Sequence, residues 1–160
     1  MRNKIIRYLA VITAAMFIFT PSVCRAGNEV YVAGMPDSWP FEFYDETAED
    51  YRGVLPDLLR QAGEAADITI KYIKPSDQDR RLALAGNIQA DAVWTLGLTE
   101  EEIKDAGLVK CRDLIVYEED REEKSISLAY TKSMETADIE KLEKAFQNID
   151  TAKIQGAYAG

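Results

Sequence analysis

The sequence predicts an α/β protein, built as a single three-layer lobe with a mainly parallel central sheet flanked by helices. Three observations support this prediction. Short β-branched runs alternate along the chain with segments whose apolar residues recur at helical spacing. One run, ADAVWTL at 90–96, is continuously apolar, as is typical of a strand buried on both faces. The repeated strand–helix alternation is the order found in parallel sheets covered by helices.

The first predicted strand and helix are separated by a non-periodic segment. EVYVA at 29–33 alternates and is β-branched, which predicts a strand. The segment 34–53 contains prolines and aromatic residues without a clear period, and it is expected to be a loop. From Val54 the apolar residues recur at helical spacing, and Pro56 is tolerated in a first turn.

The middle of the chain repeats this order. DITIKYI at 67–73 alternates polar and apolar residues and predicts a second strand. Ser76 is positioned to cap a helix over 77–85, where Arg80 and Arg81 are expected to be solvated. The buried strand 90–96 follows. Thr99 then caps a short acidic helix, with Glu102 at the capping-box position.

The last third is expected to contain two more strands and one helix. Residues 108–117 predict a fourth strand, in which Cys111 acts as a small buried apolar residue. Residues 125–131 predict a fifth strand. The charged stretch 118–124 between them reads as an exposed turn. Residues 137–149 carry an apolar helical face, and a short tail closes the chain.

The N-terminal segment has the layout of a secretory signal peptide. Arg2, Lys4 and Arg7 precede an apolar run that is short for a membrane span, and Ala26 precedes a plausible cleavage point. The expected organisation is therefore a signal peptide at 1–26 and a single lobe at 27–160, with no membrane insertion of the mature chain. An uncleaved anchor is the alternative for the same segment.

Composition excludes several functional classes. The chain has no histidine, which removes the Ser-His-Asp and Cys-His arrangements and the commonest metal ligand. No phosphate-binding, dinucleotide-binding or EF-hand spacing appears. Removing 1–26 leaves 15 of the 19 basic residues against all 28 acidic ones, a balance that repels nucleic acid. We expect no enzyme, no cofactor, no metal and, with Cys111 alone, no internal disulfide.

Four segments follow one another along the chain: VAGMPDSWPFEFYD, YRGVLPDLLRQAGEAA, GNIQADAVWTLGLT and SISLAYTKS. In this order they resemble family 3 of the bacterial extracellular solute-binding proteins, the periplasmic receptors for amino acids and related polar solutes. Members of the family have two lobes. Here the fourth strand runs through 118–124 directly into the returning strand, so the resemblance covers lobe one only, a type II periplasmic-binding-protein-like half.

The resemblance also implies a binding site. It places Asp37, Ser38 and Trp39 on the lip of a pocket, and Trp94 and Thr95 on its floor. Members that bind amino acids carry an arginine where this chain has Glu102. The resemblance therefore implies a small polar or cationic solute rather than a classical amino acid.

Each of these assignments has a structural alternative. Glu102 can instead be a helix cap, Trp39 a staple that holds the loop on the core, and Trp94 a core residue.

The function implied is that of an exported, non-enzymatic solute-binding protein of the periplasm. A membrane transporter, a sensor protein and a second copy of this chain are the candidate partners. Two alternatives remain: an interaction or sensor-accessory module that uses the former cleft to dock a protein, and a degenerate fragment that binds nothing.

Overall fold

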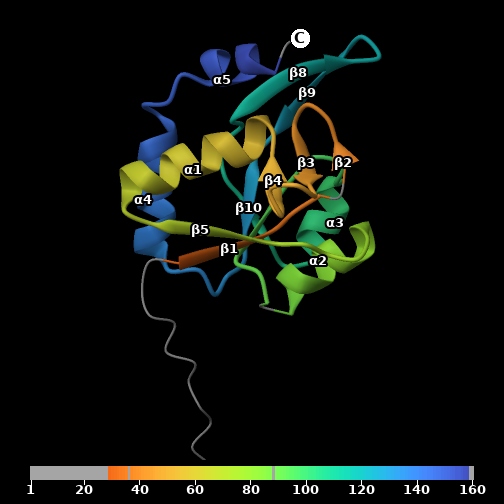
Figure 1. Cartoon of the computed structure of the whole chain (residues 1–160). Helices are drawn as coiled ribbons and strands as arrows, with labels where there is room; N and C mark the ends of the chain where they lie inside the picture. Colours follow the sequence, from red (N-terminus) through yellow and green to blue (C-terminus); the bar gives the residue numbers. More distant parts are fainter. Residues whose placement is uncertain (1–28, 36, 88, 159–160) are drawn as a thin grey trace, which may run out of the picture.

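The computed structural model describes residues 29–35, 37–87 and 89–158, so the predicted signal peptide lies outside the described residues. Its centre is a five-stranded sheet in the order β5-β1-β6-β10-β7 (Figure 1). The five strands are β1 (Glu29–Ala33), β5 (Thr69–Ile73), β6 (Ala92–Trp94), β7 (Val109–Lys110) and β10 (Leu128–Tyr130).

Strand directions confirm a mainly parallel sheet with one reversed strand. β1 pairs in parallel with β5 and with β6. β10 pairs antiparallel with both β6 and β7, so it alone runs against the other four strands. The carboxyl ends of β1, β5 and β6 consequently lie at one edge of the sheet, where ligands bind in open α/β sheets.

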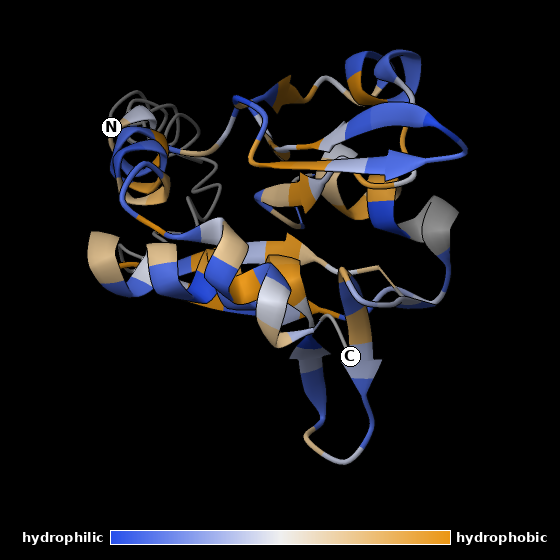
Figure 2. Ribbon diagram, turned by 90° about the horizontal axis from the view of Figure 1, so that it is seen from above, coloured by the Kyte–Doolittle hydropathy of each residue, from blue (hydrophilic) through white to orange (hydrophobic). Residues whose placement is uncertain are grey.

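Helices cover both faces, which confirms the three layers. α1 (Val54–Ala66), α4 (Thr136–Phe146) and α5 (Thr151–Ala157) contribute to one hydrophobic cluster, which contains Leu58, Leu142 and Ile154. α2 (Gln78–Gly86) and α3 (Glu100–Asp105) contribute to a second cluster with Leu84 and Ile103. The helices turn hydrophobic residues toward the sheet and hydrophilic residues outward (Figure 2). No helix among the described residues has the length and apolarity needed to cross a membrane.

The start of α1 depends on a glycine. Gly53 precedes the helix with a φ of 119°, a backbone conformation that strains any residue with a side chain. A Cβ at this position would lie 2.5 Å from the carbonyl oxygen of Phe41. This contact arises because the N–H of Leu55 donates to that same oxygen, at 2.9 Å.

Gly53→Ala is therefore expected to lower the free energy of unfolding by about 1–3 kcal/mol, from backbone strain and the backbone clash. Gly86→Ala is the matched control, since nothing lies within 4 Å of a Cβ there, and we expect a change within about 0.5 kcal/mol. Urea unfolding of the two variants measures the difference. Equal stabilities would show that the loop around Phe41 relaxes to accept the methyl group.

The segment between β1 and α1 is more regular than its sequence suggests. It forms a small antiparallel sheet of β2 (Asp37–Ser38), β3 (Glu42–Asp45) and β4 (Asp50–Arg52). The prediction of a loop was wrong here because the strands are short and turns interrupt their alternation.

The two strands predicted at 108–117 and 125–131 are each divided between sheets. Their outer parts form β8 (Ile115–Glu119) and β9 (Glu122–Ile126), a separate two-stranded hairpin. Asp120 and Arg121 turn the chain with positive φ values of 54° and 69°. The predicted turn at 118–124 is exposed, but only Asp120 and Arg121 form the turn, and its other residues belong to β8 and β9.

The end of the chain also differs from the expectation. The predicted helix 137–149 ends as α4 at Phe146, and α5 then forms within the predicted tail. Asp150 caps α5 by accepting a hydrogen bond from the N–H of Lys153 at 3.1 Å. α5 brings Tyr158 to the start of α1, where its hydroxyl donates to Asp57 at 2.7 Å.

Candidate functional site

A pocket of about 540 Å³ opens at the carboxyl ends of β1 and β6, where the fold predicts a ligand site. Three segments form its walls: the loop after β1, the loop after β6, and the β8–β9 hairpin. The lining residues are Met35, Ser38, Thr95, Leu96, Gly97, Leu98, Thr99, Tyr117, Glu119, Lys124 and Ser125.

Thr95 lies in this lining, where the family resemblance expects it. Its side chain is 7% exposed, and its hydroxyl oxygen accepts a hydrogen bond from the N–H of Ser127 at 2.8 Å. The N–H of Thr95 donates to the carbonyl of Ser127 at 2.9 Å. These two bonds fasten the end of β6 to the start of β10, so this part of the pocket is a rigid floor.

The hairpin wall is the part of the site that the sequence did not indicate. The rings of Phe41 and Tyr117 lie 4.9 Å apart, which holds the hairpin against the loop after β1. Lys124 and Glu119 form an ion pair across the hairpin at 2.5 Å. A run of charged residues normally reads as a solvated turn, and the alternation on either side of it was the one available signal of a hairpin.

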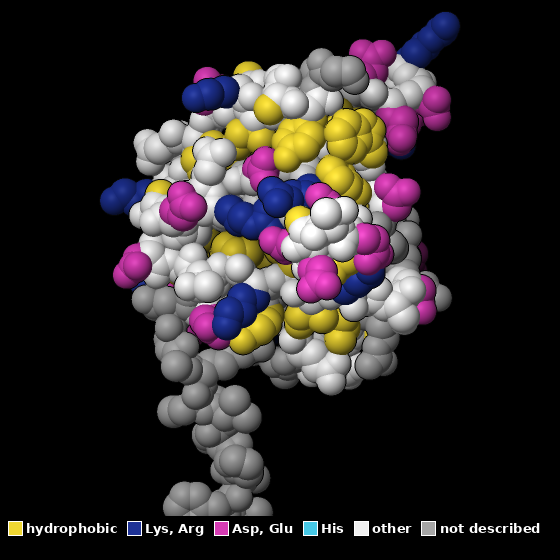
Figure 3. All heavy atoms as spheres, viewed as in Figure 1, with side chains coloured by type: hydrophobic (Ala, Val, Ile, Leu, Met, Phe, Trp, Pro, Cys, Tyr) yellow, Lys and Arg dark blue, Asp and Glu magenta, His cyan; other side chains and the backbone are white. Residues whose placement is uncertain are grey.

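Asp37 and Trp39 lie next to the pocket and outside its lining. Both are exposed, and Trp39 retains 60% of its surface. The Trp39 ring contacts Phe43 and Tyr158, with centroid distances of 5.0 and 5.9 Å. Trp39 thus has the ring contacts that a staple requires and also an exposed indole face that a ligand could contact. Hydrophobic side chains gather on this face of the molecule, near the base of the hairpin (Figure 3).

Trp94 is fully buried in the central sheet. Its indole N–H donates to the hydroxyl of Tyr72 at 3.1 Å. Because the side chain of Trp94 has no accessible surface, it packs behind the pocket floor and does not contact a ligand. This fits the core-packing interpretation.

Glu102 acts as a helix cap. One carboxylate oxygen accepts hydrogen bonds from the N–H and the hydroxyl of Thr99, at 2.7 and 2.8 Å. The N–H of Glu102 in turn donates to the Thr99 hydroxyl, which completes a capping box. The bonds from the Thr99 backbone and side chain lower the pKa of Glu102. The carboxylate expected to select a cation is thus already engaged.

The expectation that Arg81 is solvated was wrong, because Arg81 is fully buried. Its Nη2 donates to the carbonyl of Leu96 at 3.0 Å, directly behind the pocket lining. The long side chain reaches from α2 to the carboxyl edge of the sheet. Helical periodicity places a residue on a face but gives no sign that a charged side chain is buried there. The side chain of Arg80 lies outside the described part of the structure.

Glu42 is also fully buried at this edge. One of its oxygens accepts the N–H of Met35 at 2.7 Å, and the other has no hydrogen-bond partner among the described residues. Burial raises the pKa of Glu42 to about 8, against the lowering effects of the Met35 N–H and the charge of Arg81. Burial also raises the pKa of Tyr51 and Tyr72, so both stay neutral.

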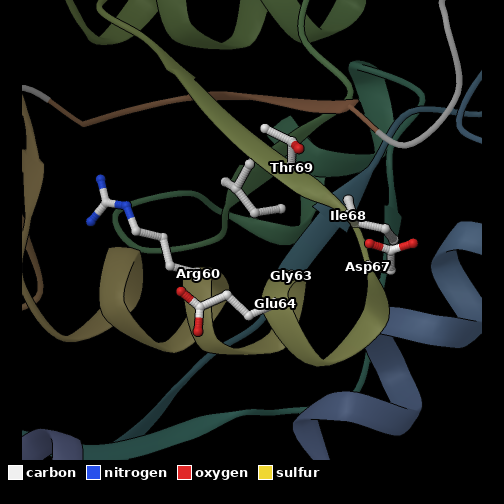
Figure 4. Close-up of a pocket in the computed structure, with 7 residues that line it drawn as sticks. Arg60, Gly63, Glu64, Asp67, Ile68 and Thr69 are labelled. Atoms are coloured by element: carbon white, nitrogen blue, oxygen red, sulfur yellow. The ribbon is translucent and has the colours of Figure 1, made fainter.

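A second hollow of about 330 Å³ lies between α1 and the start of β5 (Figure 4). It is at the amino end of β5, away from the edge that binds ligands in such sheets. Arg60, which contributes to its wall, is bound to Asp50 at 2.7 Å and to the carbonyl of Tyr51 at 2.8 Å. We assign no function to this hollow, because the Arg60 side chain is already bound to Asp50 and Tyr51.

The described residues contain no group of three or more acidic, cysteine or histidine side chains that is able to hold a metal ion. Cys111 is half-buried, and its sulfur accepts the N–H of Leu128 at 3.2 Å. Burial raises the pKa of this thiol to about 11, so it stays protonated and unreactive at neutral pH.

No protein-family model and no curated protein matches this sequence. Several solved structures share its fold. Domain 1 of TmArgBP in its arginine-bound form has a TM-score of 0.61 and 18% identity, and the match covers 76% of this chain and 94% of that one.

Two further solved structures are similar. The periplasmic domain of B. pertussis BvgS has a TM-score of 0.66 and 12% identity, over 84% of this chain and 43% of that one. A Salmonella typhimurium periplasmic binding protein described as having high arginine specificity has a TM-score of 0.64 and 9% identity, over 83% of this chain and 100% of that one.

Since all three identities are below 20%, the likeness is one of fold. The match to an isolated first domain agrees with the resemblance to lobe one that the sequence predicts. This chain therefore has the fold of a single periplasmic-binding-protein lobe, with its candidate site at the carboxyl edge of the central sheet.

Proposed function

We propose that this chain is an exported, non-enzymatic receptor lobe that binds a small polar solute in the pocket at the ends of β1 and β6. In this proposal residues 1–26 direct export to the periplasm, and 27–160 form the working lobe that a membrane transporter or a sensor protein then recognises. The observation that carries the proposal is the pocket itself, on a lobe whose fold matches a domain solved with arginine bound.

Two properties of the pocket support a small solute. Its volume of about 540 Å³ lies within the range of roughly 300–1,000 Å³ typical of small-molecule sites. The lining sets the hydroxyls of Ser38 and Thr95 beside the apolar surfaces of Leu96 and Leu98, and the Thr95 hydroxyl, which accepts from Ser127, keeps its own proton to donate. A solute bound to one open lobe stays partly wet, so weak affinity is expected.

The cation preference expected from Glu102 has lost its main support, because that carboxylate is bound to Thr99. The arginine bound by the neighbouring proteins carries both a cationic side chain and a carboxylate. The likeness in fold therefore suggests a polar, charged solute without specifying the sign of its charge.

A blocking variant tests the site. Thermal unfolding is measured against amino acids, polyamines, other cations and small organic acids; a solute at a hundred times its dissociation constant adds about 2.7 kcal/mol to stability. Ser125 is exposed on the hairpin wall, so Ser125→Trp is expected to fill the pocket and remove the shift. Ser76→Trp, at an exposed position outside the lining, should retain it.

A protein-docking module is the second candidate. The exposed indole of Trp39, packed on Phe43 and Tyr158, favours it, because large aromatic side chains are enriched at protein interfaces. If no solute of the panel raises the unfolding temperature at millimolar concentration, the receptor proposal loses its support. The result would then favour this docking module, or a fragment that binds no ligand.

A further inference from the structure

Arg81 places a buried positive charge directly behind the pocket. The guanidinium has no exposed surface, and one nitrogen donates to the carbonyl of Leu96, a residue of the pocket lining. Its Nε and Nη1 have no hydrogen-bond partner among the described residues. A buried charge without a hydrogen-bonded counter-ion is costly, so the surroundings of Arg81 favour an added negative charge.

Glu42 is the carboxylate that acts most strongly on Arg81. The two side chains do not form an ion pair within the described residues. Glu42 instead binds the N–H of Met35, another residue of the pocket lining, at 2.7 Å. With its pKa raised to about 8 by burial, Glu42 is mostly protonated at neutral pH and offsets little of the charge of Arg81.

The groups on α1, β4, β5 and the hairpin do not alter this balance. Arg60, on α1, is paired with Asp50. Tyr51 on β4 and Tyr72 on β5 are neutral, because burial raises the pKa of both. On the pocket rim, Lys124 and Glu119 offset one another.

Glu102, on α3, also attracts Arg81. It is exposed, however, so solvent screens its charge, and it already binds Thr99. At neutral pH the floor beneath Met35 and Leu96 therefore has a net positive potential.

We propose that the solute presents an anionic group, of the carboxylate kind, to the floor formed by Met35 and Leu96, and that Arg81 is the positioning residue that selects this charge. The inference rests on the proposed function and names the substrate class of the same site. Arg81 acts through the Leu96 backbone and through its field, without exposed contact. When Glu42 ionises above pH 8 it compensates Arg81, so an anion binds best below that pH.

Calorimetric titration of the full chain with probes matched in shape and opposite in charge tests this. The carboxylates are acetate, succinate and benzoate; the amines are ethylamine, 1,4-diaminobutane and benzylamine. At least one carboxylate is expected to bind at pH 6.5 more tightly than its matching amine. Its affinity should fall roughly tenfold at pH 9 and constant ionic strength, the order expected for a unit charge several ångströms away.

Two variants separate the charge from the fold. Glu42→Gln keeps a neutral side chain of the same shape, so carboxylate affinity at pH 6.5 is retained and the fall at pH 9 disappears. Arg81→Gln keeps a donor for Leu96 and removes the charge, so the preference for carboxylates is lost. Lys141→Gln, which removes an exposed positive charge from α4, is the control and should behave as wild type. If Arg81→Gln does not fold, Glu42→Gln still decides.

The outcomes distinguish this inference from the proposed function. Tighter binding of an amine than of its matching carboxylate overturns the inference and leaves a working receptor. A fall at pH 9 that persists in Glu42→Gln overturns it as well. If none of the six probes and no member of the wider panel binds, the proposed function fails and the inference with it.

Discussion

Trp94→Ala is expected to lower the free energy of unfolding by about 3–5 kcal/mol, the usual cost of removing a large aromatic side chain from a core. Trp94 is fully buried at the end of β6, between β1 and β10. The variant leaves a cavity beneath the pocket and deprives the Tyr72 hydroxyl of its indole donor. Urea unfolding followed by circular dichroism measures the loss without depending on tryptophan fluorescence.

Trp39 offers a matched comparison in the same chain. Trp39 is 60% exposed and contacts the rings of Phe43 and Tyr158, so Trp39→Ala should cost no more than about 1 kcal/mol. A large loss for Trp39→Ala would identify it as a true staple of the loop. A loss below 1 kcal/mol for Trp94→Ala would contradict its placement in the core.

The sequence predicted the elements that follow a simple period. α1 begins at Val54, as the spacing of its apolar residues predicts, and β1 spans the predicted residues 29–33. The capping box of Thr99 and Glu102 is also confirmed. Each of these features depends on residues close together in the chain, so a local pattern suffices to find them.

The sequence could not show where one strand leaves a sheet and joins another. Ile115 and Ile126 face each other at the base of the hairpin, while Leu128 belongs to the central sheet. Ile126 and Leu128 continue the same two-residue alternation, so the sequence pattern gives no sign that the chain passes from one sheet to the other. The pocket wall built by Tyr117 and Lys124 was missed for this reason.

The buried charges were missed for a different reason. Glu and Arg are almost always exposed, so the default reading of Glu42 and Arg81 is a solvated one. Their burial depends on β3, β4 and α2 closing over the same edge of the sheet. The contact between Gly34 and the Tyr51 ring belongs to this arrangement, since a Cβ at Gly34 would lie 2.3 Å from the ring.

Burial of Glu42 makes stability depend on pH in a defined direction. The unfolded chain ionises this carboxyl near its ordinary pKa of 4.5, whereas the folded protein keeps the proton until about pH 8. Unfolding therefore releases a proton between these values, and stability contributed below pH 4.5 is lost as pH rises toward 8. The slope from this single group is at most about 1.4 kcal/mol per pH unit.

Glu42→Gln removes the titrating group and keeps its shape. We expect the variant to match the wild type within about 1 kcal/mol near pH 5, because both side chains are then neutral and the substitution preserves the hydrogen bond from Met35. At pH 8 the variant should exceed the wild type by up to about 4 kcal/mol, the linkage limit over three pH units. Urea unfolding at half-unit intervals from pH 5 to 9 gives both curves.

Glu140→Gln, at an exposed position on α4, is the control that should follow the wild-type curve. Parallel curves for wild type and Glu42→Gln would mean that Glu42 is ionised in the folded protein throughout this range. Arg81 would then be neutralised from within the fold, and the pocket floor would lose its demand for an anion. The stability curve thus tests, without any ligand, the electrostatic premise on which the choice of solute depends.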